Sequence, residues 1–228
     1  QQDERSFLLR LKGTNDYTGT SMKHLSDNEH VLKRPGMYIG DTVSRGLHHT
    51  VYEVVDNSID EAMAGFAKEV SVVIHPDGSV TVEDDERGIP VDIHADLSEE
   101  FGRDVTTLEG VMTVLKFGGK FEDEAYGGVT GGLHGVGVTV VNVLSEWCIV
   151  EVRRDGHVYQ QEYERGLATT EVRRTGATSK RGTKTTYKPD AQIFKVTTFN
   201  ASTLSKRLQE LAFLNAGVKI NFKDERSD

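Results

Sequence analysis

The most regular pattern in this chain runs from Leu47 to Phe66, where apolar side chains recur every three or four residues. That spacing gathers them on one side of an amphipathic helix. From Val70 to Asp84, apolar and polar residues alternate instead, on both sides of a turn sequence at Pro76-Asp-Gly78. Alternation of this kind is typical of paired strands. The pattern therefore predicts a long helix that is followed directly by a β-hairpin.

Shorter patterns predict the other elements. Helices are expected from near Met22, over Leu108–Lys116, over Val138–Leu144 and over about Ser202–Leu214. Strands are expected over Ile149–Tyr163, which folds back at Asp155-Gly156, over Thr183–Tyr187 and over Val218–Phe222. Two stretches are expected to be loops: the acidic Asp92–Thr106, and Gly118–Gly137, whose eight glycines are typical of a mobile lid.

These elements predict one domain with a full core, because 228 residues are enough to build one. Gln1–Gly19 is polar apart from Phe7-Leu-Leu-Arg-Leu11 and has no sustained period. We therefore expect an N-terminal arm over 1–19 and a folded domain over 20–228. The chain stops among charged residues, so it is expected to be a fragment of a longer protein.

Composition excludes several classes of protein. The formal net charge of −9 argues against binding of nucleic acid through the overall field, because affinity for phosphate backbones depends on Lys and Arg. The one cysteine, Cys148, lies in the apolar run Trp147-Cys-Ile-Val150 and is expected to be a buried thiol in a reducing cytoplasm. No apolar stretch is long enough to cross a bilayer, so no membrane association is expected.

Candidate chemistry first occurs on the predicted long helix. A histidine, three acidic residues and an amide fall within an arc of about 100° opposite the apolar side: His49, Glu53, Asp56, Asn57 and Asp60. A solvated acidic face is one interpretation, because charged residues are mostly exposed. In the other interpretation, Glu53 takes a proton from a water that attacks a phosphate, His49 orients Glu53, and the amide oxygen of Asn57 binds Mg²⁺.

A second candidate is Asp84, which strand alternation places on the same core-facing side as Val80 and Val82. An aspartate at a strand end is often a turn former. The alternative is that Asp84 accepts a hydrogen bond from the exocyclic amine of adenine, which selects adenine because guanine carries a carbonyl there. Arg87 is then expected to form a surface pair with Glu61 and to hold this loop against the helix.

The third candidate is the glycine loop Gly131-Gly132-Leu133-His134-Gly135-Val136-Gly137. Its glycines have the frame of a P-loop, but Val138 stands where the phosphate-binding lysine belongs, so this is not a Walker site. Glycines still let backbone N–H groups approach phosphate oxygens, and a helix is predicted directly after the last one. A plain flexible loop is the alternative. Further on, the Thr183 hydroxyl is a candidate to reach a base.

In their order along the chain, these segments resemble the ATP-binding fold that type II DNA topoisomerases, Hsp90 chaperones, sensor histidine kinases and MutL mismatch-repair proteins share. The resemblance to the B subunits of bacterial DNA gyrases is much closer and covers about Asp16 to Asp224. It includes Lys33-Arg-Pro-Gly-Met-Tyr-Ile-Gly-Asp41, Gly46-Leu-His-His49, the helix motif from Glu53 to Ala62, Arg87-Gly-Ile-Pro90, Gly118-Gly-Lys-Phe121 and the glycine loop.

The resemblance implies a Bergerat-type ATP-binding fold, with Glu53 as general base, His49 as its partner, Asn57 as the Mg²⁺ ligand and Asp84 as the adenine acceptor. The other ATP-binding residues that it implies are Tyr17, Glu61, Arg87, Gly88, Ile89, Pro90, Gly131, Gly132, Leu133, His134, Gly135, Val136, Gly137 and Thr183. Asp84, Arg154 and Thr183 match residues of the pocket that aminocoumarin antibiotics use. Tyr17 matches the arm tyrosine that reaches the nucleotide of the partner protomer.

Three departures from the family pattern bear on function. Glu86 stands where the family motif Asp-Gly-Arg-Gly-Ile-Pro usually has its first glycine, so an extra charge lies beside the adenine site. Gly127-Gly128 stand where gyrases often carry a basic residue, so one phosphate contact is expected to be missing. The chain also ends before the family's transducer domain, whose lysine contacts the γ-phosphate, and slow hydrolysis is therefore expected from this piece alone.

We therefore predict an α+β fold, a two-layer α/β sandwich in which a mixed, mostly antiparallel sheet carries helices on one face. The predicted function is that of the ATPase domain of a DNA gyrase B subunit, which binds and hydrolyses Mg²⁺-ATP to drive dimer closure and DNA strand passage in the full enzyme. The expected partners are a second copy of the same protein, the A subunit of DNA gyrase, DNA through other parts of the enzyme, and aminocoumarin inhibitors. The alternatives are a topoisomerase IV B subunit, a kinase that acts on histidine, and a nucleotide-binding module without significant hydrolysis.

Overall fold

The computed structural model describes residues 28–115 and 137–226. The strands span Glu69–Ile74 (β1), Val80–Asp84 (β2), Ser145–Arg154 (β3), His157–Glu164 (β4), Leu167–Ala168 (β5), Arg173–Ala177 (β6), Gly182–Pro189 (β7) and Lys219–Asp224 (β8). The helices span Gly36–Ile39 (α3), Ser44–Met63 (α4), Ala95–Phe101 (α5), Thr107–Thr113 (α6), Gly137–Val143 (α8) and Ala201–Leu214 (α9). Residues 28–33 are also helical.

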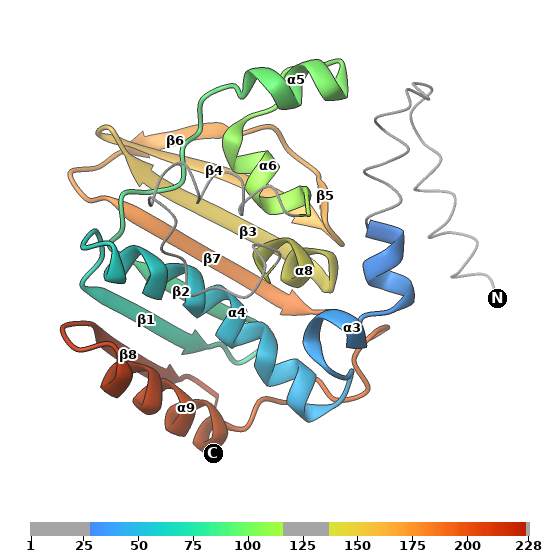
Figure 1. Ribbon diagram of the computed structural model, residues 1–228, viewed down its shortest axis with the longest axis vertical. Coiled ribbons are helices and arrows are strands. Elements are labelled where there is room, and N and C mark those ends of the chain that lie inside the picture. Colours follow the sequence, from blue (N-terminus) through green and yellow to red (C-terminus); the bar gives the residue numbers. More distant parts are fainter. Residues whose placement is uncertain (1–27, 116–136, 227–228) are drawn as a thin grey trace.

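The strands of the described residues form one eight-stranded sheet, in the order β5-β4-β3-β7-β2-β1-β8, with β6 paired to β4. Neighbouring strands are antiparallel except β1 and β8, which are parallel. The helices lie together on one face of the sheet (Figure 1). The prediction of a two-layer α+β sandwich with a mixed, mostly antiparallel sheet is therefore confirmed.

β1 and β2 form the predicted hairpin, in which Val72 lies opposite Val82. At the turn, the Ser79 amide donates to Asp77 Oδ1 at 2.9 Å, and Gly78 has a φ of 84°. Glycine adopts a positive φ readily because it has no Cβ. Val80, Val82 and Asp84 of β2 are buried, as alternation predicts, although Thr81 between them is buried as well.

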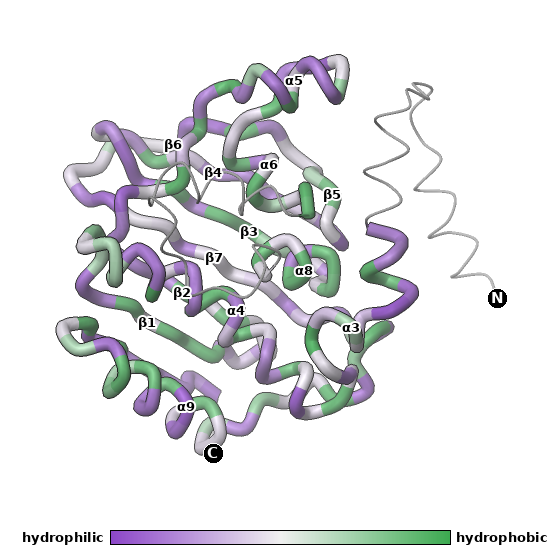
Figure 2. The backbone as a smooth tube through the Cα atoms, in the orientation of Figure 1, coloured by the Kyte–Doolittle hydropathy of each residue, from purple (hydrophilic) through white to green (hydrophobic). Residues whose placement is uncertain are grey.

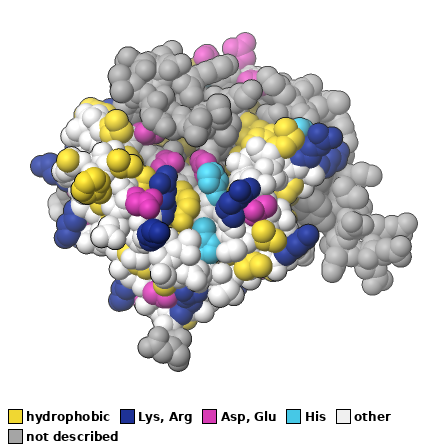
Figure 3. Space-filling model, turned by 60° about the horizontal axis from the view of Figure 1, so that its bottom comes forward, with side chains coloured by type: hydrophobic (Ala, Val, Ile, Leu, Met, Phe, Trp, Pro, Cys, Tyr) yellow, Lys and Arg dark blue, Asp and Glu magenta, His cyan; other side chains and the backbone are white. Residues whose placement is uncertain are grey.

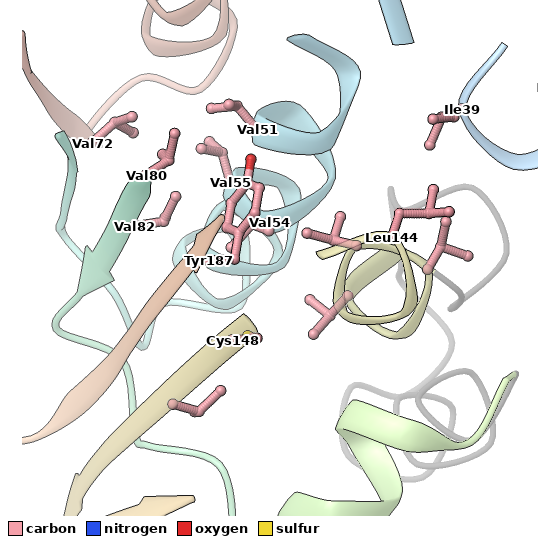
Figure 4. Close-up of a cluster of buried hydrophobic side chains, with 14 of the residues drawn as sticks. Ile39, Val51, Val54, Val55, Val72, Val80, Val82, Leu144, Cys148 and Tyr187 are labelled. Carbon is pink, nitrogen blue, oxygen red and sulfur yellow. The ribbon is translucent and has the colours of Figure 1, made fainter. Parts of the chain in front are cut away.

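The core lies between α4 and the sheet (Figure 4). Val51 and Val55 of α4 lie on the side of the helix that faces Val82 of β2 and Tyr187 of β7. Tyr187 is fully buried, and its hydroxyl is hydrogen-bonded to Thr50 Oγ1 at 2.7 Å. Because a buried hydroxyl needs a partner, this bond fixes the helix over the centre of the sheet. The apolar side predicted for the long helix is thus its buried side.

Asp41 determines where α4 begins. Its Oδ1 accepts the amide N–H groups of Val43 at 3.0 Å and of Gly46 at 2.7 Å, which would otherwise lack partners at a helix start. The helix consequently begins at Ser44, before the predicted Leu47, and ends at Met63, before the predicted Phe66. Its end is followed by Gly65 at a φ of 86°, a conformation that a helix cannot contain.

α9 and β8 complete the fold at the edge of the sheet (Figure 1). The Asn200 side chain accepts the Thr203 amide at 2.9 Å and so caps the start of α9. Leu204, Leu208 and Leu211 are buried, as their helical spacing predicts. β8 then runs parallel to β1, with Val72 paired to Phe222.

Four further elements differ from the prediction. Asp92–Thr106 is not irregular throughout, because α5 occupies its middle; His94 Nδ1 accepts the Leu97 amide at 3.3 Å, and Gly102 ends the helix at a φ of 66°. β3 begins at Ser145 instead of Ile149, because it follows α8 almost directly. The strands β5 and β6 were not predicted, since β6 is exposed along its whole length and β5 has two residues.

The hydropathy of the backbone follows this architecture. Figure 2 shows hydrophobic positions along β1 and β3 and in α8. Cys148 of β3 is a buried free thiol, as predicted, and burial raises its pKa to about 12. Within the described parts of the chain, no helix has the length and apolar character to span a membrane.

Candidate nucleotide site

Two catalytic candidates, His49 and Glu53, lie one turn apart on α4. His49 Nε2 and Glu53 Oε1 are 2.7 Å apart, so the structure brings this predicted pair into hydrogen-bond contact. Their side chains are 40% and 20% exposed, which leaves water access to the carboxylate. The hydrogen bond to Glu53 raises the pKa of His49, because the charged imidazolium is favoured next to a carboxylate.

Gly137, the last glycine of the predicted phosphate loop, lies directly against Glu53 at the start of α8. A Cβ at position 137 would overlap the Glu53 carboxylate, so a larger residue there would displace that carboxylate. The structure therefore joins the end of the glycine loop to the proposed base. The other loop candidates, Gly131, Gly132, Leu133, His134, Gly135 and Val136, lie outside the described residues, as does Tyr17.

Three further polar residues continue along the same side of α4. Burial, followed by repulsion from the Glu53 and Asp60 carboxylates, raises the pKa of Asp56 to about 6. Asn57, the candidate Mg²⁺ ligand, is exposed. Over residues 28–115 and 137–226, no group of three or more His, Cys, Asp or Glu side chains could hold a metal ion.

The carboxylate of Asp84 is buried between β2 and α4 and is held by three donors. Its Oδ2 accepts the Ser58 hydroxyl at 2.5 Å, and its Oδ1 accepts the backbone amides of Thr183 at 3.0 Å and Glu86 at 3.1 Å. Burial raises the pKa of Asp84 to about 6 even though the three hydrogen bonds lower it. A carboxylate has about four lone-pair sites, so Asp84 can still accept a donor from a ligand.

Two residues that position Asp84 were not foreseen from the sequence. The helical pattern groups Ser58 with the apolar side of the long helix, and Ser58 is indeed buried there. The sequence does contain one signal for this role: a hydroxyl on the buried side of a helix needs a hydrogen-bond partner. Gly182 has a φ of 134°, and a Cβ there would overlap the Asp84 carbonyl. Its position before Thr183 gave no sign of this close approach.

Arg87 and Glu61 form the predicted pair, which lies only partly at the surface. Arg87 Nη2 donates to Glu61 Oε1 at 2.8 Å and Nε donates to Oε2 at 3.2 Å. Glu61 is only 6% exposed, and the Arg87 guanidinium lies 3.7 Å from the centre of the Phe66 ring. The expected surface pair is therefore only half at the surface, because Glu61 is buried whereas the Arg87 side chain is 38% exposed. A bidentate pair of this kind fixes the loop after β2 against α4.

The same loop is also held by β3 and β7. Arg154 Nη1 donates to the Gly88 carbonyl at 2.9 Å, and the Ile89 amide donates to Thr183 Oγ1 at 3.4 Å. Gly88 has a φ of 78°, and a Cβ there would come 2.8 Å from the Arg153 carbonyl oxygen. The loop from Arg87 to Pro90 therefore connects Asp84, Thr183 and Arg154, the three residues that match the inhibitor pocket.

Comparison with known proteins places this site within one family. Residues 42–193 match the family described as histidine kinase-, DNA gyrase B-, and HSP90-like ATPase. The B subunit of DNA gyrase from Thermotoga maritima is 55% identical over 208 residues, which are 91% of this chain and 32% of that protein. Its counterpart from Clostridium acetobutylicum is 51% identical over 212 residues, 93% of this chain and 32% of that protein.

A topoisomerase relative is similar to the same extent. The B subunit of DNA topoisomerase 4 from Staphylococcus epidermidis is 51% identical over 215 residues, 93% of this chain and 31% of that protein. The chain thus spans about a third of the length of these relatives. The family match covers α4, β2, α8 and β7, the elements that carry the described site residues. By its motifs, its fold and this match, the chain belongs to the family of histidine kinase-, DNA gyrase B- and HSP90-like ATPases.

Proposed function

We propose that this chain is the ATP-binding and ATP-hydrolysing domain of a DNA gyrase B subunit. The observation that carries the proposal is the His49–Glu53 pair, whose carboxylate lies against Gly137. A base next to a phosphate-binding loop is suited to activate the water that attacks a terminal phosphate. The identity of 51–55% with gyrase B subunits over nine-tenths of this chain supports the same function.

The proposed reaction transfers the terminal phosphoryl group of ATP to water. Glu53 accepts the proton of the attacking water, and His49 orients Glu53 and stabilises its charge. Backbone N–H groups of the glycine loop bind phosphate oxygens. Asn57 would hold Mg²⁺, which neutralises charge on the phosphates when it is bound. Positioning and charge neutralisation supply most of the rate enhancement in reactions of this type.

The base of the nucleotide would be recognised at Asp84. An exocyclic amine that donates to this carboxylate distinguishes adenine from guanine, which has a carbonyl at that position. Thr183 contacts both the Asp84 carboxylate and the Ile89 amide, so it is positioned beside the same base. Glu61, Arg87, Gly88 and Pro90 would hold the loop that borders it.

The longer protein would use this domain as a switch. We propose that ATP binding closes a dimer with a second copy of the same protein, in which Tyr17 reaches the partner's nucleotide. Closure would act on DNA together with the A subunit of DNA gyrase. Aminocoumarin inhibitors would bind at Asp84, Arg154 and Thr183, since these residues are connected through one loop. A cytoplasmic location accords with the buried free thiol of Cys148.

The variant Glu53→Gln tests the base. Glutamine keeps the size of the side chain and accepts a hydrogen bond from His49, but it cannot take a proton. We expect phosphate release to fall by at least about a hundredfold, while the Kd for Mg²⁺-ATP changes by a few fold. Glu99→Gln, the same change at an exposed position of α5, is the matched control and should retain full turnover. A parallel loss of binding and turnover in Glu53→Gln would contradict the assignment of the base.

A topoisomerase IV B subunit is the second candidate, favoured by the 51% identity with the Staphylococcus epidermidis protein. Both candidates hydrolyse ATP at the same site, so the reaction of the full enzyme separates them. Negative supercoiling of relaxed DNA would identify a gyrase, and ATP-dependent relaxation without supercoiling would favour topoisomerase IV. A binding module without hydrolysis would show ATP binding but equal phosphate release in the wild type and Glu53→Gln.

A further inference from the structure

A second buried carboxyl group, that of Glu86, lies beside Asp84 and has no part in the function proposed so far. Glu86 is 7% exposed and Asp84 is 8% exposed, so the protein shields both from water. The Glu86 amide donates to Asp84 Oδ1 at 3.1 Å. The Thr183 side chain lies beside that of Glu86, and the Thr183 amide donates to Asp84. Thr183 therefore contacts both carboxyl groups.

The charges that surround Glu86 are mainly negative. They come from Asp84 on β2, from Glu61 on α4 and from Arg87 in the loop. The Arg87 guanidinium is bound by both oxygens of Glu61, so much of its charge is balanced there. Burial, followed by repulsion from Asp84, raises the pKa of Glu86 well above its usual range. Two adjacent buried carboxyl groups then share one proton, because ionising both is costly.

The hydrogen bonds indicate which group holds that proton. Asp84 accepts three donors, from Ser58 and from the amides of Thr183 and Glu86. Each of these bonds favours its ionised form. Beside the Glu86 carboxyl lies the Thr183 hydroxyl, a neutral group that can either donate to a carboxylate or accept from a carboxylic acid. The proton therefore resides on Glu86, and Asp84, whose pKa is about 6, is the anionic group above that pH.

We propose that Glu86 is a positioning residue of the base site, a neutral carboxylic acid that leaves Asp84 as the single anionic acceptor for the adenine amine. This inference rests on the proposed function. A bound base would exclude the remaining water from both carboxyl groups and so increase the cost of a second charge. By linkage, nucleotide binding then requires Glu86 to keep or to take up its proton, and affinity falls as pH rises and that proton is lost.

Calorimetric titration with the Mg²⁺ complex of β,γ-imido-ATP, a non-hydrolysable analogue, tests the proposal. Titrations at several values between about pH 7 and pH 9, above the pKa of about 6 of Asp84, each in buffers of different ionisation enthalpy, give both the Kd and the number of protons taken up. Glu86→Gln is close in shape and permanently neutral. Glu146→Gln, the same change at an exposed position of β3, is the matched control. Protons that belong to the nucleotide or to His49 are common to all three proteins and cancel in the comparison.

We expect the wild type and Glu146→Gln to take up more protons on binding than Glu86→Gln does. The affinity of Glu86→Gln relative to the wild type should increase with pH, approaching about tenfold per pH unit once Glu86 ionises. Equal proton numbers and equal pH profiles in all three proteins would overturn the role of Glu86 and leave the nucleotide site intact. Weak binding by Glu86→Gln at every pH would also overturn it. No binding by any of the three would overturn the proposed function itself.

Discussion

At the scale of single residues, close contacts at two glycines hold the ends of the site in place. A Cβ at Gly137 would overlap the Glu53 carboxylate, and a Cβ at Gly182 would overlap the Asp84 carbonyl. The Gly182 contact is with backbone, which cannot move aside, whereas the Gly137 contact is with the end of the Glu53 side chain, whose other oxygen is bonded to His49. At Gly176, by contrast, a Cβ would meet nothing within 4 Å.

Gly182→Ala is therefore expected to destabilise the fold strongly, whereas Gly176→Ala is not. The Gly182 backbone has a φ of 134°, and the added methyl group would overlap β2. Strain and overpacking together predict a loss of about 3 kcal/mol or more in the free energy of unfolding. Urea denaturation of both variants measures the difference, with Gly176→Ala expected within about 1 kcal/mol of the wild type. A loss at Gly182 no larger than at Gly176 would contradict the close approach of β7 to β2.

The buried carboxyl of Glu86 predicts a pH dependence of stability even without nucleotide. Burial raises its pKa from the ordinary 4.5, so the folded protein keeps a proton that the unfolded chain releases as pH rises above that value. The unfolded chain then binds fewer protons, and the free energy of unfolding falls with rising pH. Glu86→Gln should remove this part of the slope and be more stable than the wild type at pH 8. Urea denaturation at pH 5 and pH 8 measures it, and parallel slopes would contradict a retained proton.

At the scale of elements, the sequence predicts the helices and strands that bury a continuous face. The helix α4 and the strand β1 have clear periods because Val51, Val55 and Val72 return to the core at regular intervals. The helix α5 buries one leucine, Leu97, and β6 is exposed throughout. Regular burial produces the repeat of apolar residues in the sequence. A helix or strand with one buried residue or none therefore has no hydrophobic repeat that could be detected. Their positions depend on caps and on pairing with β4.

The residues of the candidate site, like the helices and strands, were predictable from the sequence only in part. The spacing of His49 and Glu53 follows from helix geometry alone, and Asp84 was identifiable as a polar residue at a position where the strand pattern requires a buried one. The contacts of Asp84 with Ser58 and Gly182 depend instead on how β2 packs between α4 and β7. No local pattern contains that information, and the catalytic and binding roles of these residues stay predictions.

The two neighbouring histidines of α4 are expected to have separate effects. His48 is buried, with Nε2 accepting the Asn200 amide at 2.8 Å and Nδ1 2.6 Å from the Ser44 carbonyl oxygen, so it joins α4 to the start of α9. His48→Ala removes both bonds and leaves a cavity, and should cost about 2–4 kcal/mol of unfolding free energy. His49→Ala should cost less than about 1 kcal/mol, because its side chain is half exposed, and should lower ATP turnover. Thermal unfolding and phosphate release of both variants separate the two roles, and equal stability losses would contradict them.

At the scale of the whole molecule, α4 connects the two ends of the proposed site. Glu53 and Ser58 are separated by five residues on this helix, a rise of about 7.5 Å, and they contact Gly137 and Asp84 respectively. The distance between the proposed base and the adenine acceptor is thus fixed by one rigid element. Figure 3 shows acidic, basic and histidine side chains close together on one face instead of a surface of one sign.

Because one helix spans both ends, binding of a complete nucleotide should stabilise the whole fold. A ligand that binds only the folded state stabilises it by mass action, by about 2.7 kcal/mol at a hundred times its Kd, so Mg²⁺-ATP should raise Tm and Mg²⁺-GTP should raise it much less.

The variant Asp84→Asn tests the adenine acceptor. Its amide oxygen can still accept the Thr183 and Glu86 amides, but its NH₂ group then takes the place of the other carboxylate oxygen. An NH₂ group is a donor and cannot accept a hydrogen bond from the adenine amine. The ATP-dependent rise should be lost in Asp84→Asn but kept in Asp85→Asn, where the carboxylate instead accepts the amides of Lys68 and Glu69. Equal rises with ATP and GTP in the wild type would mean that the phosphates are bound without recognition of the base, and would remove Asp84 from that role.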